Sequence, residues 1–133
     1  MKLLVDTNIF LEIILDQKRT EEAKAFLANP DAHELFMSDY ALHSVGVLLF
    51  RRKQHEVFSR FVKDMLFNAG VTVKALAAED MEAVVQAARR FELDFDDAYQ
   101  YAAAEKYDLV LVSFDGDFDR TERGRRTPAA ITA

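Results

Sequence analysis

Near its carboxyl end the chain reads Leu109-Val110-Leu111-Val112-Ser113-Phe114-Asp115-Gly116-Asp117-Phe118. The apolar run that opens this stretch has the length and composition of a strand buried on both faces, as the strands of parallel sheets are. In open α/β sheets, ligand-binding residues follow directly after such strands. We therefore expect Asp115 and Asp117 at the carboxyl edge of a parallel sheet, although Asp-Gly-Asp is also an ordinary tight turn.

Two further stretches carry aspartates at comparable junctions. Asp6 follows an apolar run in Leu3-Leu4-Val5-Asp6-Thr7-Asn8, and Asp97 lies in Asp94-Phe95-Asp96-Asp97-Ala98, where a helix begins. Taken singly, Asp6 is explained by helix capping and Asp97 by the attraction between a carboxylate and a helix N-terminus. Gathered at one edge of a sheet, the carboxylates would repel one another unless a cation were present. The combination therefore indicates a divalent-metal site.

The rest of the chain alternates between short apolar runs and longer helical patterns. Strands are expected at Lys2–Val5, Glu34–Met37, Val71–Lys74, Leu109–Ser113 and Ala129–Thr132. Helices are expected from Asn8 to Ile14, from Thr20 to about Asn29, from Ser38 or Asp39 to Phe50, from Val57 to Leu66 with Gly70 as the stop, from Ala78 to Phe91, and from Asp96 to Lys106. This alternation predicts an α/β fold in which helices cover a parallel sheet.

Composition narrows the class of protein. The chain has 133 residues, of which half are apolar, so we expect a single domain spanning residues 1–133. With no cysteine there is neither a disulfide framework nor a thiolate zinc site, which fits a cytoplasmic protein. A charge follows too soon after Met1 for a signal-peptide core, and no apolar stretch approaches the ~20 residues of a membrane span. We expect a soluble protein that does not enter membranes.

The formal net charge of −6 argues against a protein that coats nucleic acid through a generally basic surface. It does not exclude a nuclease, because acidic metal ligands contribute to this count and bound cations would change the local field. Positive charge is concentrated at Arg51-Arg52-Lys53 and again at Arg120, Arg123, Arg125 and Arg126. The latter four are candidate RNA-binding residues, and a solvated surface is the simpler explanation of either cluster.

Three motifs in this order and spacing resemble those of a PIN domain, in particular the compact VapC-like type. Val5-Asp6-Thr7-Asn8 resembles the opening motif of the family. Asp97-Ala98 with the small residues Ala102-Ala103-Ala104 resembles its central motif, and Leu111 to Phe118 resembles its closing motif. The resemblance covers essentially the whole chain. It implies a three-layer α/β/α fold with a central parallel sheet in strand order 3-2-1-4-5.

The same resemblance implies the roles of the site residues. Asp6, Asp97 and Asp115 would hold Mg²⁺ or Mn²⁺, hard cations that oxygen ligands suit, and would be the catalytic set. Asp117 and Asp96 would be auxiliary acidic groups. Asn8 and Ser113 would orient the ligand carboxylates or a metal-bound water.

One position departs from the family pattern. Members usually carry an acidic residue, commonly Glu, five or six positions beyond a Ser or Thr that ends the second strand. After Ser38 this chain has His43 and Ser44 there, with no glutamate between Glu34 and Glu56. His43 could replace the ligand or carry a proton, or it could be a buried histidine bonded to backbone. A site with one carboxylate fewer holds hard cations less firmly. The three aspartates could still bind one metal.

The function implied is a metal-dependent endoribonuclease, the toxin of a VapBC-type toxin–antitoxin pair. Its partners would be an RNA substrate, a small antitoxin and a second copy of the chain. The helical pattern around Val45, Val47, Leu48 and Leu49 is compatible with a dimer face and equally with core packing. A degenerate PIN domain that binds RNA or protein without cleavage is the alternative that the departure favours.

A phosphotransfer receiver or an aspartyl phosphatase would also place acidic groups at strand ends. A receiver should show paired acidic residues near its start and a lysine after its last core strand, whereas this chain has a single Asp6 and late arginines. A phosphatase of the Asp-x-Asp type would need an aspartate at position 8, which is Asn8. Both are poor matches.

Overall fold

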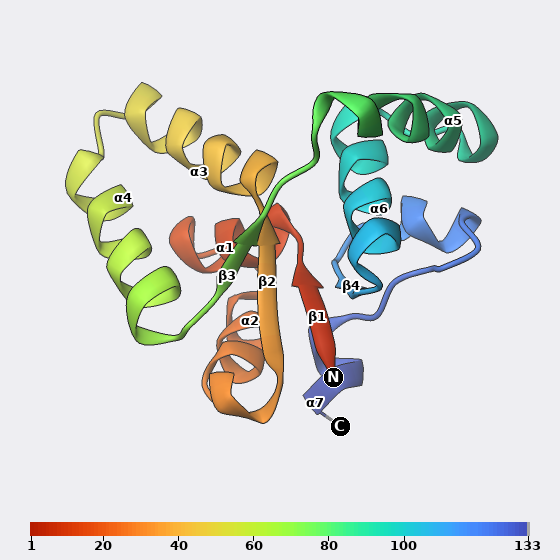
Figure 1. Cartoon of the computed structure of the whole chain (residues 1–133). Coiled ribbons are helices and arrows are strands. Elements are labelled where there is room, and N and C mark those ends of the chain that lie inside the picture. Colours follow the sequence, from red (N-terminus) through yellow and green to blue (C-terminus); the bar gives the residue numbers. More distant parts are fainter. Residues whose placement is uncertain (133) are drawn as a thin grey trace.

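The computed structural model describes residues 1–132, and its centre is a parallel sheet of four strands in the order β3-β2-β1-β4. The strands are β1 (Lys2–Val5), β2 (Glu34–Ser38), β3 (Thr72–Lys74) and β4 (Val110–Val112). β1 lies between β2 and β4, with Leu4 opposite Phe36 on one side and Leu111 on the other. Their carboxyl ends therefore meet at one edge of the sheet, the upper edge in Figure 1.

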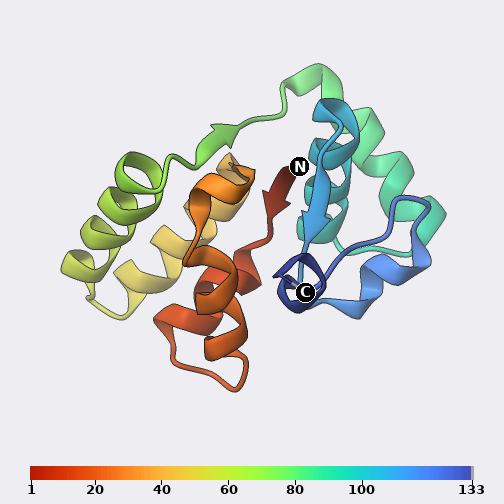
Figure 2. The same ribbon diagram turned by 90° about the horizontal axis from the view of Figure 1, so that it is seen from below.

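Helices cover both faces of the sheet. They are α1 (Thr7–Ile14), α2 (Thr20–Leu27), α3 (Asp39–Arg51), α4 (His55–Val62), α5 (Met81–Phe91), α6 (Phe95–Tyr107) and the short α7 (Pro128–Thr132). The helices α1 to α4 lie on one side and α5 and α6 on the other (Figure 2). No helix within residues 1–132 is long and apolar enough to cross a membrane.

The core is divided by the sheet into two apolar clusters, as the alternation of side chains along β1 requires. Leu3 and Val5 contribute to the cluster under α1, α3 and α4, whereas Leu4 contributes to the cluster under α5 and α6. Because all three are fully buried, β1 is apolar on both faces. This confirms the expected α/β layers and explains the unbroken run that precedes Asp6.

The expected order of the first four strands, 3-2-1-4, is confirmed, but the fifth strand expected at Ala129–Thr132 is wrong. Residues Pro128–Thr132 form helix α7, which packs against α2. Proline is favoured in the first turn of a helix, and Thr127 Oγ1 accepts a hydrogen bond from the backbone of Ala130 (3.3 Å) in the manner of an N-cap. Strand-like pairing occurs earlier in the chain, where Arg126 forms one parallel bridge with Val112.

The helix after α4 also differs from expectation in its geometry. The chain continues from α4 into a π-helical segment, η2 (Lys63–Asn68), rather than a regular α-helix, before Gly70 ends it with φ of +73°. Three short 3₁₀ segments complete the chain: η1 (Pro30–Ala32), η3 (Ala78–Asp80) and η4 (Gly116–Arg120). Of these, η4 follows β4 and carries Asp117 into the edge where the strands end.

Candidate metal centre

The carboxyl edge of the sheet brings the three motifs together. Asp6 directly follows β1, and its backbone N–H donates to Val112 O of the neighbouring β4 (2.9 Å). Asp115 follows β4 after two residues. Asp97 lies in the first turn of α6, whose N-terminus lies at the same edge in Figure 1. The fold therefore joins residues that are far apart in the sequence.

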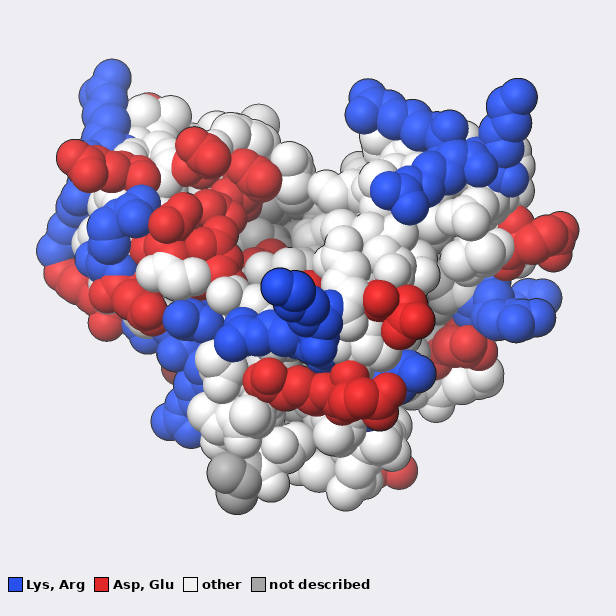
Figure 3. All heavy atoms as spheres, turned by 180° about the vertical axis from the view of Figure 1, so that it is seen from behind, with Lys and Arg blue, Asp and Glu red and all other residues white. Residues whose placement is uncertain are grey.

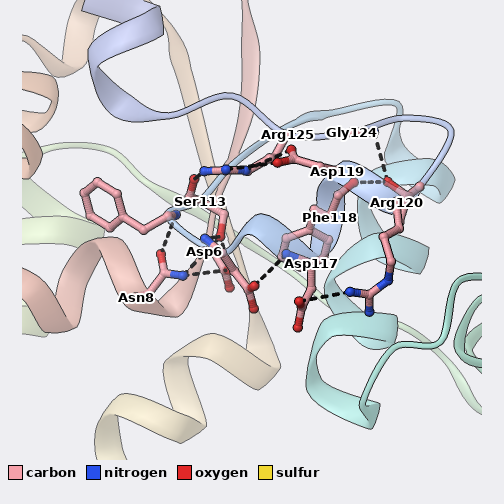
Figure 4. A network of polar contacts seen from close by, with 12 residues as sticks. Asp6, Asn8, Ser113, Asp117, Phe118, Asp119, Arg120, Gly124 and Arg125 are labelled. Atoms are coloured by element: carbon pink, nitrogen blue, oxygen red, sulfur yellow. Dashed lines mark hydrogen bonds and ion pairs between the residues drawn. The ribbon is translucent and has the colours of Figure 1, made fainter.

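Asp6 is buried, with 6% of its surface exposed, and its carboxylate is surrounded by donors. Oδ1 accepts hydrogen bonds from Thr7 N (2.8 Å) and Gln100 Nε2 (2.9 Å). Oδ2 accepts from Ser113 Oγ (2.7 Å) and, at 3.4 Å, from Asn8 Nδ2. Figure 4 shows Asp6, Asn8 and Ser113 pointing toward one another. With four donors on a group that has about four acceptor sites, little of Asp6 is left for another ligand.

Asn8 and Ser113 connect this network to the loop after β4. Asn8 Nδ2 donates to Ser113 Oγ (3.0 Å), and Asn8 Oδ1 accepts from Phe114 N (3.2 Å). Ser113 Oγ also accepts from Asp115 N (3.0 Å). Both side chains therefore connect Asp6 to the loop that carries Asp115.

Gln100 is a residue of the site that the sequence did not reveal. It is 2% exposed, and its Oε1 accepts a hydrogen bond from Ser38 Oγ (2.5 Å), whose oxygen also caps α3 by accepting from Ala41 N (3.0 Å). A continuous buried path thus runs from Asp6 to the start of α3. A signal did exist, because Gln100 stands three residues after Asp97 on one helix face and is the polar member of a run of alanines and tyrosines.

A second group of carboxylates lies beside this network and is more exposed than Asp6. Asp97, Asp115 and Asp117 each offer a carboxylate oxygen within 4.8 Å of the others; the first two are half-buried and the third is exposed. Asp6 is not a member of this group within residues 1–132. Asp115 also caps η4 by accepting from Asp117 N (2.8 Å), so its ligand and turn roles coexist.

The pKa values of Asp97 and Asp6 are both raised by burial, but hydrogen bonds lower that of Asp6 whereas neighbouring carboxylates raise that of Asp97. Burial, together with the charges of Asp115, Asp6 and Asp96, raises the pKa of Asp97 to about 7. Burial also raises the pKa of Asp6, against the hydrogen bonds from Gln100, Ser113 and Thr7, which lower it. The repulsion at Asp97 is that of carboxylates sharing a site without a cation. Figure 3 shows acidic side chains gathered on the half of the rear face that carries α5 and α6, beside a hollow.

The donor set fits a hard divalent cation. Carboxylate oxygens are the ligands that Mg²⁺ and Mn²⁺ prefer, and opposite ligands of one Mg²⁺ lie about 4.2 Å apart. Oxygens already within 4.8 Å of one another need to move only slightly to reach one ion. A bound cation would also relieve the repulsion that raises the pKa of Asp97.

Three of the four arginines expected to bind RNA have partners inside the chain. Arg120 donates to Asp117 (3.0 Å) and to the carbonyls of Phe91 and Glu92 at the end of α5. Arg123 pairs with Asp108 (3.0 Å). Arg125 donates to both carboxylate oxygens of Asp119 (3.1 Å each) and to Ser113 O (3.2 Å). Figure 4 shows it beside Asp119. Arg126 is exposed.

The position that departs from the family pattern lies on α3. His43 is exposed and lines a shallow hollow with Leu42, Gly46, Val47, Phe50 and Phe58. Ser44 is half-buried. Neither residue belongs to the acidic group described above, and Asp96 is exposed next to Asp97 without joining that group.

Known proteins resemble this chain in sequence and in fold. The PIN domain family matches residues 3–124. VapC20, a sarcin–ricin loop cleaving toxin from Mycobacterium tuberculosis, is 25% identical, with 88% of this chain and 92% of that chain covered and a TM-score of 0.72. A chain of a toxin–antitoxin complex from Klebsiella pneumoniae is 24% identical over 95% of this chain and 97% of its own, with a TM-score of 0.69.

A chain of VapBC2 from Rickettsia felis, bound to a DNA fragment from its promoter, shares only 14% identity but has a TM-score of 0.76, over 95% of this chain and 97% of that one. No curated protein matches the chain. The family match spans most of the residues and includes all three aspartate motifs. The chain therefore belongs to the PIN domain family.

Proposed function

We propose that this PIN domain is a metal-dependent endoribonuclease and the toxin of a VapBC-type toxin–antitoxin pair. The observation that carries the proposal is the convergence of Asp97, Asp115 and Asp117 within 4.8 Å at the carboxyl edge of the sheet. PIN domains are generally nucleases, and VapC20 is a toxin that cleaves the sarcin–ricin loop. An acidic group without a cation would repel the phosphates of such a substrate, so the function requires a metal.

Asp97 and Asp115 are the residues that would hold Mg²⁺ or Mn²⁺, with Asp117 as a further ligand that Arg120 already contacts. A bound ion of this class lowers the pKa of water and stabilises the charge that develops on a phosphate during displacement. Asp6 has a different part in this proposal. Because its oxygens are engaged by Thr7, Gln100, Ser113 and Asn8, it holds β1, β4 and α6 in register around the ligands.

The partners proposed are RNA, a small antitoxin and a second copy of the chain, in the cytoplasm. The antitoxin is suggested by the toxin–antitoxin complexes from Klebsiella pneumoniae and Rickettsia felis to which the chain is similar. A short reading frame next to the coding sequence on the source DNA would support the toxin role.

The test compares wild type with Asp97→Asn on labelled single-stranded RNA and on a folded tRNA pool, each with Mg²⁺, Mn²⁺ or chelator. Asp31→Asn, at an exposed aspartate of η1 outside the acidic group, is the matched control. We expect metal-dependent cleavage that Asp97→Asn abolishes and Asp31→Asn leaves intact. Loss of one group of a metal site commonly reduces turnover by about 100-fold or more.

A binding-only PIN domain is the second candidate, and the absence of an acidic residue at His43 and Ser44 favours it. Its signature would be a folded wild type that binds RNA or protein and cleaves no RNA under either metal. In that case Ser44→Glu, which supplies the carboxylate usual in the family, should introduce metal-dependent cleavage.

A further inference from the structure

Arg19 contacts the loop that carries Asp115 although it comes from the opposite end of the sequence. It occupies the N-cap position of α2, in the turn after α1. Its guanidinium lies over the ring of Phe114, with Cζ 4.7 Å from the ring centroid. Phe114 stands between Ser113 and Asp115, in the loop that the site network holds in place. The turn after α1 therefore places a positive charge against the loop that joins β4 to Asp115.

The contacts of Arg19 hold its backbone and the face of its guanidinium, and within residues 1–132 they leave its two terminal nitrogens without a hydrogen bond. Its backbone N–H donates to Glu12 Oε2 (2.9 Å), and the backbone of Phe114 is tied to Asn8 Oδ1 (3.2 Å). The nearest carboxylate is Glu22, at 4.0 Å from Arg19 Nε, and the other oxygen of Glu22 accepts from Ala129 N (3.0 Å). Within residues 1–132, neither terminal nitrogen of Arg19 donates a hydrogen bond, and the side chain is half exposed at 50%.

This state contrasts with that of the arginines after β4. Arg125 is only 17% exposed on its side chain and directs three donors to Asp119 and Ser113 O. Arg120 and Arg123 are likewise committed to carboxylates and carbonyls. In a chain of net charge −6 a polyanion needs local cations, and Arg19 offers an ordered one with free donors.

The chemistry of Arg19 suits a phosphodiester. A guanidinium presents parallel N–H groups that match two oxygens of one phosphate, and stacking on an aromatic ring holds its plane in one orientation. Phosphate contacts of this kind position a nucleic-acid strand without reading its sequence. We propose that Arg19, held on Phe114, binds a backbone phosphate of the RNA strand next to the phosphate at the acidic group; the inference rests on the proposed ribonuclease function.

The first experiment measures binding of a short end-labelled single-stranded RNA by fluorescence anisotropy in chelator, so that cleavage does not interfere. Salt is varied from about 0.05 to 0.5 M for wild type, Arg19→Gln and Lys18→Gln. Lys18 is the adjacent exposed cation, so Lys18→Gln is the matched control for loss of one charge.

Each phosphate neutralised on a single strand contributes about 0.7 to the slope of log K against log salt. Arg19→Gln should therefore reduce the slope by about 0.7 and weaken binding about fivefold at 0.1 M salt, while Lys18→Gln changes both less. Arg19→Lys should keep the slope and lose part of the affinity, because lysine lacks the planar fork. Equal losses in Arg19→Gln and Lys18→Gln would show a general charge effect and would overturn the proposal.

A second experiment locates the phosphate. One charge at a time is removed from the RNA by methylphosphonate substitution, and binding is measured to wild type and to Arg19→Gln. One position should weaken binding to wild type and have no effect on Arg19→Gln. If every position affects the two proteins alike, Arg19 touches no particular phosphate and serves instead a protein partner or the fold.

These readouts separate the inference from the proposed function. Cleavage in Mg²⁺ or Mn²⁺ is recorded on the same RNA. Cleavage with an Arg19-independent slope would leave the nuclease standing and overturn the phosphate contact. An Arg19-dependent slope without cleavage would support the contact and identify a binding-only domain. Failure of wild type to bind single-stranded RNA at any salt, in chelator and in Mg²⁺ alike, would overturn the contact. Unchanged thermal unfolding of Arg19→Gln would confirm that the half-exposed side chain does not act through stability.

Discussion

The carboxylate of Asp6 and the carboxylates of Asp97, Asp115 and Asp117 lie at the same edge of one sheet in opposite chemical situations. Asp6 is 6% exposed and accepts four hydrogen bonds. The other three face one another within 4.8 Å, and their mutual repulsion contributes to the raised pKa of Asp97. Asp6 is surrounded by donors from the protein, whereas the other three carboxylates lie close to one another.

Aspartates which look equivalent in three sequence motifs therefore differ in burial and in the hydrogen-bond donors that surround them. The hydrogen-bond donors around each carboxylate account for this difference. Thr7, Gln100 and Ser113 each direct an N–H or O–H at Asp6, and these hydrogen bonds lower its pKa against burial, which raises it. Removing Asp6 should therefore destabilise the fold far more than removing Asp97 does.

The largest expected effect is the loss of stability on replacing Asp6. Asp6→Ala should reduce the free energy of unfolding by about 3–5 kcal/mol, because it leaves buried donors unpaired and opens a cavity. Asp97→Ala should reduce it by far less in the absence of metal. Urea unfolding in chelator measures both, and equal losses would mean that the two carboxylates are not in different situations.

The second prediction concerns the buried path through Gln100. Gln100→Leu has nearly the same volume but deprives Asp6 Oδ1 of a donor and Ser38 Oγ of its acceptor, so we expect a loss of about 2 kcal/mol. Gln86→Leu is the control, since Gln86 is exposed on α5 and bonds only to Glu82. A cost for Gln100→Leu no greater than that of the control would show that Asp6 does not depend on this path.

The third prediction uses the pKa of Asp97. The unfolded chain releases this proton near pH 3.8 and the folded chain near pH 7, so the folded state holds an additional proton between them. Stability of the metal-free protein should therefore fall as the pH rises through this window. Asp97→Asn, which cannot ionise, should become more stable than wild type by about 1–2 kcal/mol at pH 8, a value reduced for solvent screening of a half-buried group.

Thermal unfolding of both proteins in chelator across this pH range checks the expectation, and Mg²⁺ should abolish the difference at pH 8 by stabilising wild type alone. A difference that does not change with pH would mean that Asp97 is ionised throughout and that its neighbours do not repel it.

The smallest effect is expected at Arg125. Arg125→Gln removes the paired contact with Asp119 and the bond to Ser113 O, and should reduce the free energy of unfolding by about 0.5–1 kcal/mol. Because this guanidinium is already engaged, the salt dependence of RNA binding should stay unchanged. A slope reduced by about 0.7 would instead return Arg125 to the RNA-binding residues expected from the sequence.

Local patterns in the sequence were sufficient for much of the fold. The strand Lys2–Val5 was expected with the bounds that the structure has, because an apolar run followed by Asp-Thr-Asn marks both the strand and the helix cap. Ser38 or Asp39 was expected to cap α3, and in the structure Ser38 is the cap. The strand expected at Ala129–Thr132 failed for a local reason as well, since Pro128 and Thr127 start a helix there.

The site was predicted less completely. Motif spacing indicated that Asp6, Asp97 and Asp115 would meet, but Gln100 was missed because its partners Asp6 and Ser38 are distant in the sequence. The arginines after β4 were read as free charges, and their pairing with Asp108, Asp117 and Asp119 appears only when the loop is folded. Arg19 carried no local signal, since Phe114 reaches it only across the sheet edge.

The sequence by itself determined the alternation of strands and helices, the caps that begin α1 and α3, and the placing of aspartates at strand and helix ends. These depend on hydrophobic periodicity and on hydrogen bonds between near neighbours, which short stretches contain. Only the tertiary structure decided which aspartate is surrounded by donors, which ones face a shared space and which arginines find carboxylates from other segments. Those properties depend on burial and on partners from other segments, because desolvation and charge act through space and not along the chain.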